Sequence, residues 1–131
     1  MFLDVWEWYI LEDSHQCFSG DLMKKISAKL LRIYLKEEDK YGKELLINSI
    51  IKTLKNNGIA GATVFKGFCG YGTRGISRID ILRLSMNLPA VIECIDYEEK
   101  LNDIMPKLVE MVSENGLITI QDIDVFKELK K

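Results

Sequence analysis

Histidine, cysteine and long apolar runs are all scarce in this sequence of 131 residues. The single histidine is His15, and the three cysteines, Cys17, Cys69 and Cys94, have no short spacing between them. A structural zinc site takes about four closely spaced ligands, and a disulfide scaffold takes an even number of cysteines. We therefore expect no metal site within one subunit, and free thiols in a reducing cytoplasm.

Signals for a membrane or for export are also missing. No run of about eighteen apolar residues occurs, and acidic Asp4 and Glu7 stand where a signal peptide carries positive charge. A net charge of −2 gives no general attraction to nucleic acids or acidic membranes. We expect a cytoplasmic protein with no membrane span and no nucleic-acid partner. Any anion binding must come from a local concentration of positive charge.

The composition is that of one globular domain with an N-terminal extension. Hydrophobic residues make up 47% of the sequence and charged residues 29%, which is ordinary for a globular chain of this length. Residues 1–27 show no sustained period, and we interpret them either as a genuine extra element or as the result of a start assigned too far upstream. Met23 would be an alternative start. The folded domain is expected to span residues 28–131.

From Ala28 onward, strand and helix periods alternate. The two-residue and 3.6-residue periods of apolar positions distinguish strands from helices. Four strands are predicted, at residues 28–35, 59–66, 89–95 and 117–120, and the last of them could continue to Val125. Two helices are predicted, at residues 43–56 and 97–114. The order βαββαβ predicts an α+β, ferredoxin-like sandwich, in which a four-stranded antiparallel sheet carries both helices on one face.

The predicted helix ends have recognisable signals. Asn57-Gly58 and Asn115-Gly116 should each end a helix, because glycine adopts the left-handed conformation that commonly closes one. Asp96 and Glu99 have the spacing of a capping box at the start of the second helix.

The first predicted strand is apolar on both sides. If Leu31, Ile33 and Leu35 face the helices, then Leu30 and Tyr34 face away from them. A large apolar sheet face left uncovered usually marks an interface. We expect subunits to stack their sheets against one another, with coverage by the N-terminal extension as the competing explanation.

The segment that could carry chemistry lies between residues 67 and 83. Four of the nine glycines fall between positions 67 and 75. The cations around them are Lys66, Arg74, Arg78 and Arg83, and the single acid is Asp80, which gives a local net charge of +3. Glycines allow backbone N–H groups to converge on an anion, and arginine forks match phosphate oxygens. The predicted phosphate-binding residues, with an aromatic ring for stacking, are Lys66, Gly67, Gly70, Tyr71, Gly72, Arg78 and Arg83. A flexible basic loop without a ligand is the alternative.

Other candidates carry weaker signals. Lys40 lies in the turn after the first strand and could reach a phosphate across a subunit boundary. The acidic run Glu37–Asp39 in the same turn could bind a divalent cation or simply be solvated. Cys69 is the one thiol with a plausible reactive position, yet it lacks a histidine base, so we expect no catalytic residues.

From Leu30 to about Val125, the sequence resembles the family called domain of unknown function 190, a relative of the PII nitrogen regulatory proteins. The residues that carry the resemblance are Leu31–Leu35, Gly58–Val64, Lys66-Gly67, Gly70–Gly72, Ser77–Ile79, Leu82–Ser85 and Leu88–Glu93. The resemblance implies a ferredoxin-like subunit that assembles as a homotrimer. PII-like trimers bind adenine nucleotides in clefts between subunits, and a long loop after the second strand regulates a partner.

The resemblance and the residues together predict a non-enzymatic signalling protein. Its ligand would be AMP, ADP or ATP, and its regulated partner is unknown, with a transporter as one candidate. No cofactor is required. Two other functions remain open. One is a divalent-metal-responsive trimer of the cation-tolerance type, against which the shortage of histidine counts. The other is a small hydrolase or transferase, for which no paired carboxylates or Cys/His constellation is evident.

Overall fold

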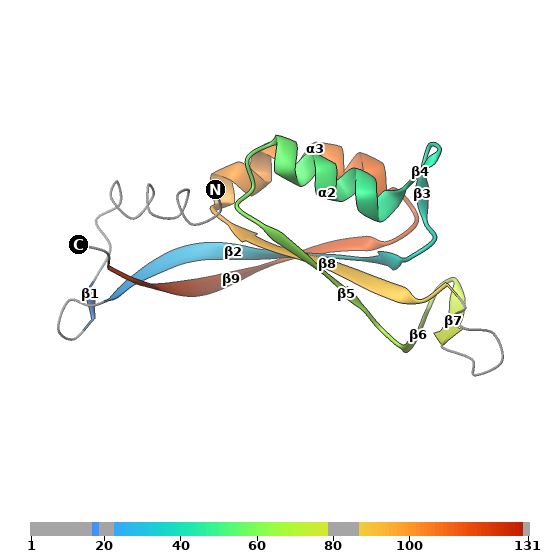
Figure 1. The fold of residues 1–131 in the computed structure, drawn as a ribbon, viewed down its shortest axis with the longest axis horizontal. Helices are drawn as coiled ribbons and strands as arrows, with labels where there is room; N and C mark the ends of the chain where they lie inside the picture. The colour runs from blue at the N-terminus through green and yellow to red at the C-terminus, as the bar shows by residue number, and fades with distance from the viewer. Residues whose placement is uncertain (1–16, 19–22, 79–86, 130–131) are drawn as a thin grey trace.

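The computed structural model describes residues 17–18, 23–78 and 87–129. Its main sheet is antiparallel, with β2 and β8 in the centre and β9 and β5 at the edges (Figure 1). These four strands are β2 (Met23–Lys36), β5 (Ala62–Lys66), β8 (Pro89–Asp96) and β9 (Leu117–Glu128). The two-residue strand β1 (Cys17–Phe18) pairs with the start of β2.

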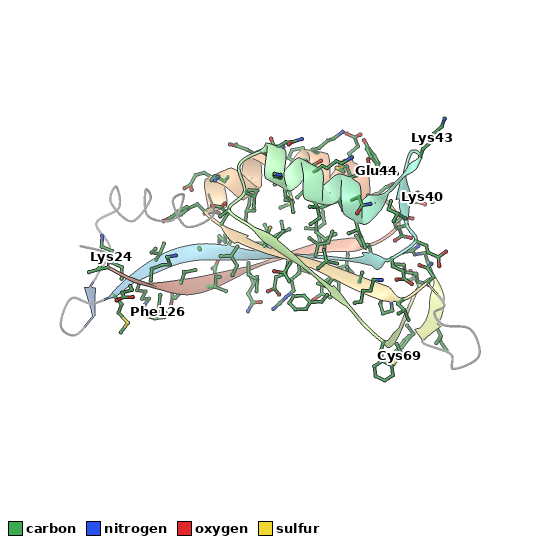
Figure 2. The ribbon with its side chains drawn as sticks, in the orientation of Figure 1. Lys24, Lys40, Lys43, Glu44, Cys69 and Phe126 are labelled. Carbon is green, nitrogen blue, oxygen red and sulfur yellow. The ribbon has the colours of Figure 1, made fainter. Side chains whose placement is uncertain are left out.

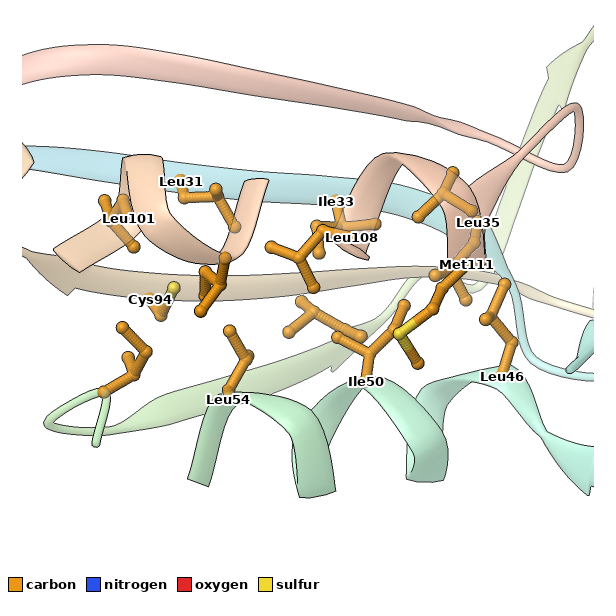
Figure 3. Packing of buried hydrophobic residues seen from close by; sticks show 14 of the residues in the cluster. Leu31, Ile33, Leu35, Leu46, Ile50, Leu54, Cys94, Leu101, Leu108 and Met111 are labelled. Carbon is orange, nitrogen blue, oxygen red and sulfur yellow. The ribbon is translucent and has the colours of Figure 1, made fainter. Parts of the chain in front are cut away.

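Both helices lie on one face of this sheet (Figure 1). They are α2 (Leu46–Asn56) and α3 (Glu98–Val112). Their apolar stripes pack onto Leu31, Ile33 and Leu35 of β2, which are at most 5% exposed (Figure 3). Burying such side chains fully contributes about 1.5–3 kcal/mol each. The predicted ferredoxin-like architecture and the predicted orientation of β2 are both confirmed.

Strand β2 changes its buried side along its length. Ile26 and Ala28 are buried in the first half of the strand, whereas Leu31 and Ile33 are buried in the second half. Because successive side chains of a strand point to opposite faces, the buried face switches near Leu30. The first half forms a separate small cluster, distinct from the core beneath the helices. The two-sided apolar pattern of β2 therefore serves two clusters on opposite sides of the sheet.

Several boundaries differ from the predicted ones. Strand β5 begins at Ala62 rather than at Ile59, and strand β9 continues past Val125 to Glu128. Strand β2 begins at Met23 rather than at Ala28, because the long partner strand β9 continues alongside it to Glu128. Helix α2 begins at Leu46 rather than at Lys43. The intervening residues form a short hairpin of β3 (Lys40–Tyr41) and β4 (Glu44–Leu45). The predicted extension at residues 1–27 lies mostly outside the described residues.

The prediction of a capping box at Asp96 is wrong. Asp96 is the last residue of β8, and Tyr97 precedes α3 without a side-chain cap. The Asp96 carboxylate is fully buried and accepts hydrogen bonds from the backbone N–H groups of Ala60, at 3.0 Å, and Tyr97, at 2.7 Å. Lys100 lies 3.4 Å away as its ionic partner. Asp96 thus joins the loop before β5 to the end of β8.

The two Asn-Gly pairs play different roles. Gly58 has φ +75° after α2, which confirms the predicted left-handed end of that helix. Helix α3 instead ends at Val112, and the positive φ of +48° falls on Ser113. Gly116 is needed for another reason, because a Cβ on it would lie 1.8 Å from the backbone oxygen of Tyr34. It allows the start of β9 to approach the end of β2.

Candidate functional site

The glycine-rich segment forms a small hairpin at one end of the main sheet (Figure 1). Strand β6 (Cys69–Gly72) pairs with strand β7 (Gly75–Arg78), and Thr73-Arg74 makes the turn between them. Gly75 has φ +100°, a conformation that side chains rarely allow. The glycines thus build a tight turn that presents Arg74 at the tip of the hairpin.

Arg74 fastens the hairpin tip to the end of β2. Its Nη1 and Nη2 atoms donate to the two carboxylate oxygens of Asp39 at 2.8 and 2.9 Å. Nη2 also donates to the backbone oxygen of Asn115, and Lys36 Nζ donates to the backbone oxygen of Arg74 at 3.5 Å. Asp39 itself is only 7% exposed and accepts the backbone N–H of Lys36 at 2.9 Å.

The electrostatics of this pair favour both charges. Burial raises the pKa of Asp39, but the hydrogen bonds from Arg74 and from the Lys36 N–H outweigh it, so the pKa is lowered overall. The hydrogen bond to Asp39 raises the pKa of Arg74. At neutral pH the tip is therefore held by a charge-assisted, bidentate contact, which is stronger than a contact between neutral groups.

A second ion pair lies beside the first. Lys66 Nζ is 2.9 Å from the Glu37 carboxylate, which also accepts the backbone N–H of Leu88 at 3.1 Å. The acidic run considered as a cation site is therefore engaged in holding the glycine-rich segment. Across the described ranges 17–18, 23–78 and 87–129, no three His, Cys, Asp or Glu side chains are grouped as metal ligands.

A cleft of about 490 Å³ lies beneath the hairpin. One wall is the hairpin itself, from Cys69 to Gly75, and the opposite wall is formed where β2 ends and where β8 and β9 begin. Tyr34 and Leu117 on that wall are 40% and 57% exposed. Lys36 and Arg74 supply positive charge to the lining, and Glu114 supplies a negative charge. The cleft thus combines open apolar surface with backbone groups and two cations.

The structure brings together part of the predicted site. Gly70, Tyr71 and Gly72 line the cleft, and the Tyr71 side chain is 90% exposed. Lys66 and Gly67 stand next to the cleft but outside its lining, since Lys66 pairs with Glu37 and the Gly67 N–H donates to the backbone oxygen of Pro89 at 2.8 Å.

Three predicted cations are not placed in the cleft. Lys40 lies on the β3–β4 hairpin, on the helix side of the sheet, whereas Cys69 lies on the other side (Figure 2). Arg78 ends β7, and its side chain lies outside the described part of the structure. Arg83 belongs to residues 79–86, which are likewise outside it. The roles of Arg78 and Arg83 stay predictions.

Sequence reasoning missed the wall opposite the hairpin. The start of β9 pairs with the end of β2, with Leu117 opposite Tyr34. This pairing brings Tyr34, Lys36 and Leu117 together in the lining of the cleft. The signal was available, because the predicted topology makes the first and last strands antiparallel neighbours. Arg74 was counted in the local charge but not assigned a role, since nothing in the sequence shows that it would meet Asp39.

The two described free thiols should differ in reactivity. Burial, followed by the charges of Asp96 and Glu93, raises the pKa of Cys94 to about 12, whereas Cys69 is exposed beside the cleft. Because the thiolate is the reactive form, iodoacetamide at pH 8 is expected to label Cys69 in the native protein and Cys94 only after denaturation. Peptide mass spectrometry of a Cys17→Ser background measures both. Native labelling of Cys94 as fast as that of Cys69 would contradict the assignment.

Among the described residues, neither helix has the length and hydrophobicity needed to cross a membrane.

Two solved structures have a fold similar to that of this chain. The fold is similar to that of CPII, a nitrogen regulatory PII-like protein from Thiomonas intermedia K12, with a TM-score of 0.62 and 19% identity over 78% of this chain and 91% of that one. A PII-like signalling protein from Thermus thermophilus has a TM-score of 0.53 and 21% identity over 79% of this chain and 91% of that one. The fold is therefore PII-like.

Sequence relatives identify the family. A UPF0166 protein of Methanocaldococcus jannaschii is 56% identical over 102 residues, which cover 78% of this chain and 94% of that protein. A UPF0166 protein of Aquifex aeolicus is 35% identical over 79% of this chain and 97% of its own length. The family model described as "Uncharacterized ACR", domain of unknown function 190, matches residues 28–125. The chain belongs to the domain of unknown function 190 family, the UPF0166 proteins, and it has a PII-like fold.

Proposed function

We propose that this protein is a PII-like regulatory protein that binds an adenine nucleotide in the cleft beneath the β6–β7 hairpin. The observation that carries the proposal is the composition of the cleft. A glycine-rich backbone and Arg74 face a wall with exposed Tyr34 and Leu117. Backbone N–H groups of glycines, which no Cβ shields, and the guanidinium of an arginine can donate hydrogen bonds to phosphate oxygens. The apolar wall and the Tyr71 ring can pack against a flat base.

The structural neighbours support the choice of nucleotide. CPII from Thiomonas intermedia K12 has been solved bound to ADP, AMP and bicarbonate. That protein shares the fold but only 19% of its residues with this chain, so its ligands suggest a class of compound rather than a specific one. AMP, ADP and ATP are therefore the compounds to test first.

Assembly as a homotrimer would complete the cleft. Tyr34, Phe65 and Leu117 are 40%, 52% and 57% exposed, and the pairing register places all three on the sheet face away from the helices. A second subunit that covers this face would also close the apolar wall of the cleft. The nucleotide would then lie between subunits, where its binding could be transmitted through the assembly.

The proposed role is signalling without catalysis in the cytoplasm. Binding of the phosphates would change the position of the hairpin, and a regulated protein, with a transporter as one candidate, would recognise that change. The cation-tolerance alternative gains no support from the described residues, because Glu37 and Asp39 are both occupied by cationic side chains.

Calorimetric titration of the full-length protein tests the function. We expect AMP or ADP to bind with millimolar affinity or better, and light scattering to report three subunits. The Arg78→Ala/Arg83→Ala double variant should bind at least about tenfold more weakly, because each charged hydrogen bond contributes roughly 1.5–3 kcal/mol. Lys43→Ala/Lys55→Ala removes two exposed cations that do not line the cleft and serves as the matched loss of charge.

The titration tests the assignment of the binding residues and the proposed function separately. If the double variant and the wild type bind with equal affinity, the assignment of Arg78 and Arg83 is wrong. If none of the three nucleotides binds at millimolar concentration, the proposed function is wrong. Turnover of a bound nucleotide would contradict the non-enzymatic role.

A further inference from the structure

Arg74 already binds an oxyanion within the protein. Its guanidinium donates one hydrogen bond to each carboxylate oxygen of Asp39, at 2.8 and 2.9 Å. A phosphate group offers two oxygens to an arginine fork in the same bidentate manner. The Asp39 carboxylate therefore occupies the position that a ligand phosphate would take on this arginine.

The location of the pair lets a ligand reach it. The Arg74 side chain is 36% exposed and lines the cleft, whereas the Asp39 side chain is 6% exposed and belongs to the turn after β2. Asp39 is fixed there by the backbone N–H of Lys36, and the backbone N–H of Leu46 donates to its carbonyl at 2.7 Å. The arginine lies on a two-residue hairpin turn. The partner that can move is thus Arg74.

We propose that a phosphate-bearing ligand binds in the cleft by taking Arg74 away from Asp39, so that binding releases the tip of the β6–β7 hairpin from the end of β2. The inference rests on the proposed function and specifies how the same site is regulated. Asp39 acts as an internal competitor that weakens the apparent affinity of the ligand. Because linkage is reciprocal, the ligand weakens the attachment of the hairpin to the same extent.

The neighbouring ion pair provides a matched control. Glu37 and Lys66 also join the acidic turn to the glycine-rich segment, at 2.9 Å, but neither residue lines the cleft. Breaking that pair removes one carboxylate charge from the same turn without freeing a cleft arginine. Asp39→Asn and Glu37→Gln each remove one carboxylate charge at nearly unchanged side-chain volume, and they release different cations, Arg74 in the first and Lys66 in the second.

The test is titration of the full chain with AMP and, separately, with inorganic phosphate. Asp39→Asn is expected to bind AMP on the order of tenfold more tightly than the wild type, because the competing charged contact is lost. Glu37→Gln should bind like the wild type. Arg74→Ala, added to Asp39→Asn, should abolish the gain. Tighter binding of both AMP and inorganic phosphate by Asp39→Asn shows that the phosphate group is what replaces the carboxylate.

A second test changes Arg74 and leaves Asp39 and its turn unaltered. Arg74→Lys keeps the charge but loses the fork, and AMP should bind it on the order of tenfold more weakly than the wild type. If Asp39→Asn binds AMP no more tightly than the wild type, or if Arg74→Lys binds AMP as well as the wild type, the proposal that phosphate displaces Asp39 from Arg74 is wrong. The proposed nucleotide binding would still stand. If neither the wild type nor Asp39→Asn binds AMP, the proposed function fails and the inference fails with it.

Discussion

Gly116→Ala is expected to destabilise the domain by roughly 3 kcal/mol or more, since a new side-chain carbon placed against rigid backbone forces the strands apart. The added Cβ would lie 1.8 Å from the Tyr34 oxygen and 3.0 Å from its carbonyl carbon. No side-chain rotation can relieve that contact. The start of β9 would have to move away from the end of β2, which also displaces Leu117 from the wall of the cleft. Urea denaturation followed by circular dichroism measures the change.

Gly72→Ala is the matched control. A Cβ on Gly72 would have no heavy atom within 4 Å. Its free energy of unfolding should stay within about 0.5 kcal/mol of the wild type, as for most surface changes. If Gly116→Ala behaves like Gly72→Ala, the close approach of β9 to Tyr34 is not a feature of the folded protein.

Asp96→Ala should lower the free energy of unfolding by roughly 2–4 kcal/mol, because it removes a charged acceptor from two backbone donors. The carboxylate receives the N–H groups of Ala60 and Tyr97, and both residues are less than 10% exposed. Lys100 also loses its ionic contact with Asp96 at 3.4 Å. The connection between β8 and the loop before β5 should therefore loosen, which amide hydrogen exchange at Ala60 would report alongside denaturation.

Two further variants refine the Asp96 prediction. Asp96→Asn keeps the volume but leaves one acceptor oxygen for two donors, so its loss of stability should lie between those of the wild type and Asp96→Ala. Asp103→Ala removes an exposed carboxylate from the middle of α3 and should change stability by no more than about 0.5 kcal/mol. Equal stability of Asp96→Ala and Asp103→Ala would show that the buried carboxylate contributes nothing.

The periodicity of apolar residues was sufficient to predict the layers of the fold. Leu31, Ile33 and Leu35 occupy every second position because one side of β2 packs against the helices. That two-residue period is visible in the sequence of the strand itself. The ends of elements were harder to predict. Asp96 has the spacing of a helix cap, yet its carboxylate is buried against Ala60 from a distant part of the sequence. Local spacing does not reveal such a partner.

The candidate site shows the same division. The cluster of Gly70, Gly72 and Gly75 was interpreted as an anion-binding or flexible loop, and the structure has a two-stranded hairpin there. Its positive charge suggested cations free to bind an anion, but Arg74 contacts Asp39. That pairing depends on where the hairpin folds back relative to the end of β2. The composition of one segment therefore does not show how its charges are held.

A crystal structure of the protein grown with AMP or ADP is the most direct test of the account. We expect the phosphate against the β6–β7 hairpin and within hydrogen-bonding distance of Arg74, and the base against Tyr34 or Tyr71 at a boundary between subunits. A nucleotide bound elsewhere, with the cleft empty and Arg74 still on Asp39, would contradict the central claim.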